Sequence, residues 1–97
     1  SFIRQAFLPT ARIEGVRDGK LRSWTVDDYA AGFKGTPPAN ERERSRTIDL
    51  INVAGGAAVA RATLVIDANT TIVDYFVLLK VDGEWKIANK VYSANVK

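Results

Sequence analysis

The 97-residue sequence contains no cysteine and no histidine. Without cysteine the chain cannot form disulfides or zinc–thiolate sites, and this composition fits a reducing compartment. Without histidine it lacks the commonest general base and the commonest metal ligand. We therefore predict no metal site, and carboxyl groups are the bases that remain for any acid–base chemistry.

The sequence also lacks clusters of like charge and long apolar runs. No stretch approaches the roughly 20 apolar residues that span a bilayer, and no signal-peptide pattern opens the chain. The net charge is +3, and basic residues alternate with acidic ones, as in residues 41–46. The arginines there lack interleaved aromatic residues, which argues against nucleic-acid binding. The sequence predicts a single cytoplasmic domain that has no membrane segment.

The N-terminal third predicts a helix end, a hairpin and a short helix. Residues 1–8 have helical spacing that stops at Pro9, and no capping residue stands upstream, so we expect the ordered domain to begin before Ser1. Residues 12–24 flank Asp18-Gly19, a two-residue hairpin turn that would pair Ile13 with Trp24. Residues 25–35 predict a helix that Thr25 caps and that ends at Gly35.

The remainder, residues 45–97, predicts a four-stranded antiparallel meander. Gly55-Gly56 stands between two strands rather than between a strand and a helix. It is therefore a turn and not a phosphate-binding loop, and we predict no nucleotide cofactor. The last two strands form a long hairpin, from Ile72 to Val91, that turns at Asp82-Gly83.

The register of this hairpin decides which side chains share a face, because a slip of one residue exchanges the faces. A two-residue loop would put Leu79 beside Lys86 and mix charged with apolar groups. A three-residue loop, Val81-Asp82-Gly83, instead pairs Leu79 with Trp85 and Tyr75 with Asn89. We predict the three-residue loop, which also sets Asp74 opposite Lys90 as an ion pair on the outer side.

In that register one face of the hairpin is almost wholly apolar and the other is mixed. On the apolar face, Tyr75 and Asn89 either satisfy each other's hydrogen bonds within the core or serve as polar groups of a ligand pocket. The candidate pocket residues are Tyr29, Phe33, Tyr75, Trp85 and Asn89. The mixed face is too apolar for free solvation and suggests a homodimer contact through Phe76, Leu78, Ala88 and Tyr92.

The order of elements, together with the segment from Asp74 to Tyr92, resembles the putative lumazine-binding family. That family belongs to the nuclear-transport-factor-2-like superfamily, which includes the SnoaL-like cyclases. The resemblance implies an α+β fold in the shape of a cone, with a curved antiparallel sheet of about six strands wrapped on helices around an apolar pocket. It also implies a homodimer formed through the sheet, and an N-terminal helical part that this chain largely lacks.

The resemblance leaves the function open, because the superfamily contains both enzymes and binding domains. Our first hypothesis is a domain that binds a small apolar or heterocyclic ligand. The alternatives are a cofactor-independent isomerase, dehydratase or cyclase that uses a carboxylate and a tyrosine, and a dimerisation module without a ligand. Tyr75, Asp49 and Asp74 are nominal counterparts of superfamily catalytic residues, but none matches a catalytic motif, so no catalytic role is assigned to them.

Overall fold

The computed structural model describes residues 2–32 and 45–95. It contains two short helices and six strands. In chain order these are α1 (Phe2–Ala6), β1 (Arg12–Arg17), β2 (Lys20–Thr25), α2 (Val26–Ala31), β3 (Ser45–Ala54), β4 (Ala57–Asp67), β5 (Thr70–Val81) and β6 (Glu84–Ala94). The second helix ends earlier than the predicted residue 35, because α2 stops at Ala31 and Gly32 forms its C-cap. Gly35 and Phe33 lie outside the described residues.

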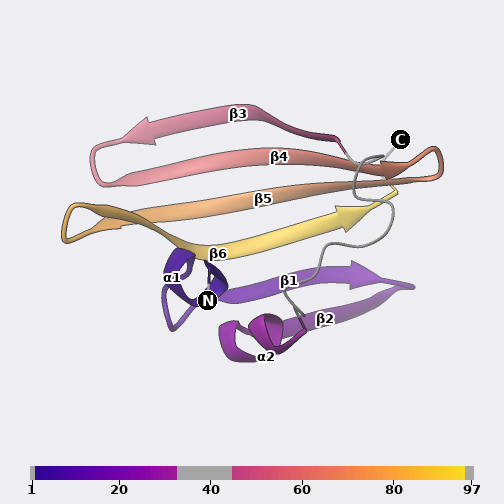
Figure 1. Ribbon diagram of the computed structural model, residues 1–97, viewed down its shortest axis with the longest axis horizontal. Coiled ribbons are helices and arrows are strands. Elements are labelled where there is room, and N and C mark those ends of the chain that lie inside the picture. The colour runs from indigo at the N-terminus through magenta and orange to yellow at the C-terminus, as the bar shows by residue number, and fades with distance from the viewer. Residues whose placement is uncertain (1, 33–44, 96–97) are drawn as a thin grey trace.

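All six strands form one curved sheet in the order β2-β1-β6-β5-β4-β3 (Figure 1). The four-stranded meander and the early hairpin are confirmed, and each is antiparallel within itself. The two parts join through β1 and β6, which run parallel, with Ile13 beside Lys90 and Gly15 beside Tyr92. The sheet is therefore mixed, and the parallel pair is a feature that the local sequence pattern did not predict.

Local signals in the N-terminal part give the expected structure. Asp18 and Gly19 have φ values of 53° and 75°, which suit the two-residue turn that right-handed strand twist favours. The turn pairs Ile13 with Trp24, as predicted. The Thr25 hydroxyl accepts a hydrogen bond of 3.1 Å from the backbone N–H of Asp28 and so caps α2.

The hydrophobic core lies where α1 and α2 pack on one face of β1, β2 and β6 (Figure 1). Its buried residues are Phe7, Ala11, Ile13 and Val26. Trp24, Tyr29, Ile87 and Tyr92 pack around them. The far half of the sheet carries no helix among the described residues, and every residue of β3 is exposed.

The predicted register of the last hairpin is wrong. Asp82 and Gly83, with φ values of 51° and 82°, form a two-residue turn that places Leu79 beside Lys86. A β-bulge at Ala88 then shifts the pairing, so that Tyr75 lies opposite Val91 rather than Asn89. The extra residue in β6 changes the register partway along the hairpin, so that the pairing near the turn does not fix the pairing further along the strands.

The burial of the two hairpin faces is also the reverse of the prediction. We call the side of the sheet that α1 and α2 cover the helix-side face, and the opposite side the outer face. Phe76, Lys90 and Tyr92 lie on the helix-side face, where Lys90 contacts the rings of Phe76 and of Tyr29 in α2, and Tyr92 stacks on Trp24 of β2. Tyr75 and Val77 lie on the outer face and are 41% and 48% exposed. Beyond the bulge, the face that was expected to be buried is therefore the exposed one, whereas Ile87, nearer the turn, packs against the core as expected.

Candidate functional site

A lysine held among aromatic rings marks the centre of the helix-side face. The Lys90 ammonium donates a hydrogen bond of 2.9 Å to the Tyr29 hydroxyl. It also lies 4.9 Å from the centroid of the Tyr29 ring and 5.8 Å from that of the Phe76 ring. Cation–π attraction and the hydrogen bond together fix this ammonium at the boundary between α2 and the sheet.

Asp74 is the acidic partner of this lysine. Its Oδ2 atom lies 3.7 Å from Lys90 Nζ, and the two side chains are only 16% and 12% exposed. The predicted contact between Asp74 and Lys90 is thus confirmed, but it lies on the helix side. The contact is diagonal, because Asp74 pairs directly with Tyr92, and Phe76 with Lys90.

The second oxygen of Asp74 is buried and has no hydrogen-bond partner among the described residues. Burial raises the pKa of the Asp74 carboxyl, and the nearby Lys90 ammonium opposes this shift. Such a carboxyl group can accept a hydrogen bond from a ligand. It could also exchange a proton with one.

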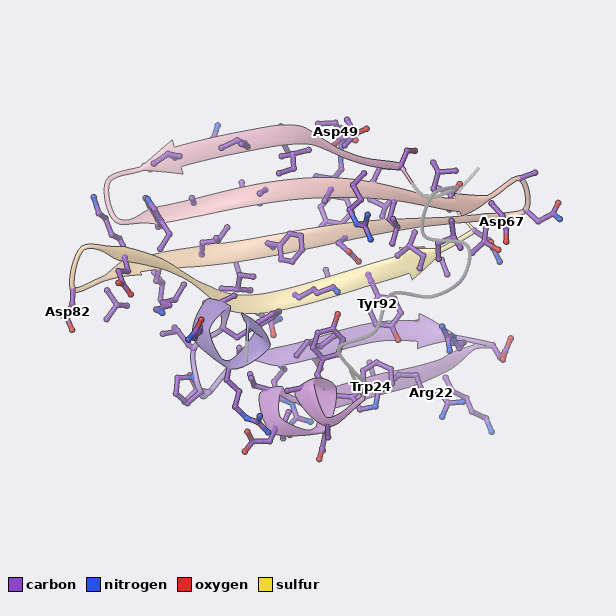
Figure 2. The ribbon with its side chains drawn as sticks, viewed as in Figure 1. Arg22, Trp24, Asp49, Asp67, Asp82 and Tyr92 are labelled. Carbon is purple, nitrogen blue, oxygen red and sulfur yellow. The ribbon has the colours of Figure 1, made fainter. Side chains whose placement is uncertain are left out.

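Tyr92 occupies the other side of the same face. Its ring stacks on Trp24, with the centroids 6.0 Å apart and the planes inclined by 21°, and the two side chains approach each other in Figure 2. A Cβ atom on Gly15 would lie 2.5 Å from Tyr92 Cζ, so only glycine leaves room for the ring. The Tyr92 hydroxyl is buried and has no partner among the described residues.

A pocket of about 440 Å³ opens on the helix-side face beside this cluster. It is lined by Arg46, Thr47, Ile48, Ala62, Thr63, Leu64, Asp74 and Phe76. Ala62 faces this side, because it pairs with Asp74, and its small side chain leaves room in the lining. A small residue within a strand is visible in the sequence, and it is a signal that could have indicated the pocket.

The outer face has a separate polar network in which Asp49 accepts hydrogen bonds from Arg61 and, at 2.8 Å, from the Thr63 hydroxyl. These hydrogen bonds lower the pKa of the Asp49 carboxyl. Asp49 lies at a bulge of β3, at the edge of the sheet (Figure 2). The network is accessible to solvent.

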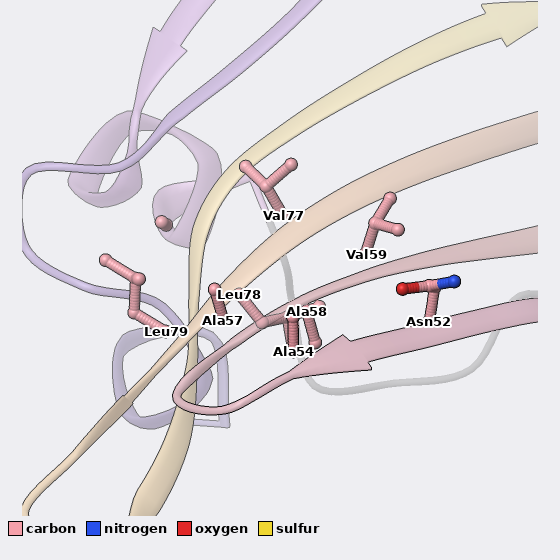
Figure 3. Close-up of a pocket in the computed structure, with 9 residues that line it drawn as sticks. Asn52, Ala54, Ala57, Ala58, Val59, Val77, Leu78 and Leu79 are labelled. Atoms are coloured by element: carbon pink, nitrogen blue, oxygen red, sulfur yellow. The ribbon is translucent and has the colours of Figure 1, made fainter.

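The outer face also holds a shallow apolar hollow of about 440 Å³ (Figure 3). Val59, Val77 and Asn52 point to the same side of the sheet in this view. The lining is completed by Ala54, Ala57, Ala58, Leu78, Leu79 and Ala88.

The structure does not bring the predicted pocket residues to one place. Tyr29 lies on the helix side, Tyr75 on the outer face, and Trp85 beside Lys80 near the hairpin turn, 39% exposed. The Asn89 side-chain oxygen accepts a hydrogen bond of 3.1 Å from the backbone N–H of Arg12. Asn89 therefore has a structural partner, and that partner is not Tyr75.

The predicted dimer-face residues do not share an exposed surface either. Phe76 lines the helix-side pocket, and Tyr92 packs against the core. Leu78 and Ala88 line the hollow of Figure 3. Asp74 and Lys90 are the residues of the site that sequence reasoning placed on the wrong side.

Comparison with known proteins identifies the chain's relatives. Residues 1–93 match the family described as "Putative lumazine-binding". The chain belongs to the putative lumazine-binding family. No curated protein matches it significantly.

Solved structures agree with this family and with its nuclear-transport-factor-2-like (NTF2-like) fold. An NTF2-like protein of unknown function from Shewanella baltica has 29% sequence identity and a TM-score of 0.82, over 97% of this chain and 76% of that one. Another from Methylobacillus flagellatus has 31% identity and a TM-score of 0.76, over 95% and 73% of the two chains. A third, from Silicibacter pomeroyi, has 24% identity and a TM-score of 0.80, over 95% and 76%. The predicted NTF2-like fold is confirmed.

Two further properties concern only residues 2–32 and 45–95. No helix in these ranges is long and apolar enough to cross a membrane. Within the same ranges, no three acidic side chains gather as a possible metal site.

Proposed function

We propose that this member of the putative lumazine-binding family is a small-molecule-binding domain whose ligand, a flat heterocycle, occupies the helix-side pocket. The observation that carries the proposal is a pocket of about 440 Å³, within the range of roughly 300–1,000 Å³ that ligand sites occupy. Its lining combines apolar side chains with the largely buried carboxyl group of Asp74 and with the polar residues Arg46, Thr47 and Thr63. That combination suits a ligand with an aromatic body and a polar edge.

The shape of the lining supports a flat ligand. The small side chain of Ala62 leaves room in the lining, and the Phe76 ring supplies an aromatic surface at the wall. Aromatic rings pack against one another in stacked or edge-to-face arrangements that add about 0.5–1.5 kcal/mol beyond burial. The family description is consistent with a heterocycle of the lumazine type.

The test is a thermal-shift screen followed by titration calorimetry, with pteridinediones, isoalloxazines, purines and hydrophobic acids as probes. We expect at least one flat heterocycle to raise Tm and to bind with a measurable Kd. Ala62→Leu fills the pocket floor and should abolish that binding. Ala94→Leu, at the exposed end of β6, should leave it unchanged. Failure of every probe, or equal binding by the Ala62→Leu variant, would overturn the proposal.

We also propose that the protein forms a homodimer through the outer face. Leu50, Tyr75, Val77, Leu79 and Val91 are each 41–48% exposed on this face. The outer surface of β3–β6 covers about 650 Å² when estimated from the usual strand spacing and rise. This is close to the roughly 800 Å² per partner of a stable interface. A second copy offers a surface of the same size and apolar character.

Sedimentation velocity tests the dimer. Val77→Lys places a charge within the hollow of Figure 3 and should produce monomers. The matched control is Val53→Lys, because Val53 is 56% exposed but pairs with Ala58 on the helix side. This control should remain dimeric. A wild-type protein that sediments as a monomer at micromolar concentration would contradict the proposal.

A further inference from the structure

Strand β3 (Ser45–Ala54) ends the sheet on one side, and no strand among the described residues pairs with its free edge, the edge away from β4 (Figure 1). All ten of its residues are exposed. Ile48 and Ile51 face the helix side by their pairing with Ala62 and Ala60, and they are 66% and 65% exposed. A long, apolar, uncovered edge is a template for pairing with another strand.

The ladder between β4 and β5 shows which backbone groups of β3 point towards the free edge. The Lys80 N–H donates a hydrogen bond of 2.8 Å to the Gly56 carbonyl, so even-numbered residues of β4 direct their backbone groups towards β5 and odd-numbered ones towards β3. The β3 partners of the odd-numbered residues therefore point towards β4. The partners of the even-numbered residues point towards the free edge, and these are Arg46, Ile48, Ile51 and Val53.

The bulge at Asp49 makes this set of four residues symmetrical. Two of them precede the bulge and two follow it, and each pair has a spacing of two residues. All four side chains lie on the helix side, because their partners on β4 do. A second β3 that runs antiparallel about a two-fold axis at the bulge therefore keeps hydrogen-bonding groups and faces matched. In this register Arg46 pairs with Val53 of the second copy, and Ile48 with Ile51.

The side chains that meet in this register are compatible. On the helix side, Ile48 of each copy lies beside Ile51 of the other, so the two most exposed apolar side chains of β3 cover each other. On the outer face, Asp49 of each copy lies opposite Leu50 of the other rather than opposite a second acid. Each Asp49 carboxylate is also paired with Arg61 of its own chain. The free edge of β3 is thus complementary to itself.

We propose that two copies of this protein pair through the free edges of β3, antiparallel and in this register, so that one continuous sheet runs through both. This interface differs from the proposed outer-face dimer, in which one sheet stacks on another, and it requires no ligand. Only one strand of each copy takes part, so the buried area is below the roughly 1,200 Å² of a standard interface. Edge pairing therefore needs a higher protein concentration than the stacking of whole faces.

Sedimentation velocity on Val77→Lys isolates the edge, because a lysine there opposes the stacking of outer faces. This variant should be monomeric at low micromolar concentration and should dimerise at hundreds of micromolar. Adding Ile51→Pro removes an N–H that points towards the free edge and leaves the ladder with β4 intact, so it should abolish that dimer. Adding Ile51→Lys keeps the N–H but places a charge in the apolar contact, and it should weaken the dimer.

The matched control is Leu21→Pro in the same Val77→Lys background. Leu21 is 69% exposed on β2, the other edge strand, and its N–H also points away from the sheet, because Arg17 and Lys20 close the two-residue turn before it. This control should still dimerise, and circular dichroism checks that each variant keeps the wild-type fold. A Val77→Lys protein that stays monomeric at hundreds of micromolar would overturn the proposal, as would equal association of the Ile51 variants and the control.

Disulfide trapping tests the register, and the chain has no cysteine of its own to interfere. Thr47 would face Asn52 of the second copy, whereas within one chain these residues lie roughly 15 Å apart along β3, beyond the reach of a disulfide. Thr47→Cys/Asn52→Cys should therefore oxidise to a covalent dimer. Stacked sheets lie about 10 Å apart, so the outer-face dimer cannot form this bond. Thr47→Cys/Ile51→Cys, shifted by one residue, is the control, and equal cross-linking of the two variants would refute the register.

Discussion

The contact between Gly15 and Tyr92 gives the sharpest test of the helix-side face. In Gly15→Ala the new Cβ would lie 2.5 Å from Tyr92 Cζ and 2.7 Å from both Cε atoms. Carbon atoms prefer separations of about 3.5–4.0 Å. The overlap is thus about 1 Å, and the ring cannot move freely because it stacks on Trp24.

Two opposing effects determine the magnitude. Overpacking a well-packed site costs about 1–3 kcal/mol. Replacing glycine by alanine within a strand recovers about 0.5–1 kcal/mol of backbone entropy, and Gly15 has no positive φ that would add strain. We expect a net loss of about 1–2 kcal/mol in the free energy of unfolding, or roughly 5–15 °C in Tm for a domain of this size.

A double-mutant cycle in urea isolates the cause. Tyr92→Leu removes the ring, so Gly15→Ala in that background should be neutral or slightly stabilising. The coupling energy between the two sites should then be at least about 1 kcal/mol, as for residues in direct contact. If Gly15→Ala costs the same with and without the Tyr92 ring, the packing of Tyr92 on β1 is refuted.

Three further predictions concern the turns and the acidic groups. Gly83→Ala should lower the free energy of unfolding in urea by about 1–2 kcal/mol, because φ at this position is +82°. The control Gly56→Ala, whose new Cβ would make an ordinary contact, should not lower it. Equal losses in the two variants would contradict the turn geometry. Burial raises the pKa of Asp74 above its usual 3.8, so the folded state binds this proton more tightly than the unfolded state. The stability of wild type relative to Asp74→Asn should therefore fall as pH rises from about 4 through the raised pKa, and a difference independent of pH would argue against it. Hydrogen bonds lower the pKa of Asp49 below its usual 3.8. The stability that wild type gains over Asp49→Asn should therefore be present above pH 3.8 and disappear as pH falls through the lowered pKa. A stability difference that changes with pH in the opposite direction would contradict that network.

Features that depend on a few neighbouring residues were predictable from the sequence. The Asp18-Gly19 and Asp82-Gly83 turns need positive φ at adjacent positions, which these residue pairs adopt most readily. The Thr25 cap needs only the N–H of Asp28, three residues away. Likewise, the contact between Asp74 and Lys90 survived an error in register, because long side chains reach diagonal as well as direct neighbours.

The register of the last hairpin was not predictable in the same way. A uniform register forces a choice between good pairs near the turn and good pairs further along. The bulge at Ala88 removes that choice by adding one unpaired residue. Beyond the bulge, the observed pairing differs from the predicted one by two residues, so Tyr75 and Asn89 still share a face although they are no longer opposite each other. A slip of two residues keeps each set of side chains together, whereas a slip of one would have mixed them.

The candidate site was misplaced because counting apolar residues does not identify the buried face of such a sheet. Valines such as Val77 and Val91 stabilise a strand whether its surface faces a core, a partner or solvent, and here they are 48% and 43% exposed. On the helix-side face two charged groups are held internally: Lys90 contacts Asp74 at 3.7 Å and Tyr29 at 2.9 Å. An acid and a base that can pair across adjacent strands, flanked by aromatic residues, therefore indicate the helix-covered side of this sheet better than a run of valines does. That pairing places Asp74 and Lys90 together on the helix-side face, where Asp74 lines the pocket, whereas Tyr75 lies on the outer face and the Asn89 side chain is bonded to the backbone of β1.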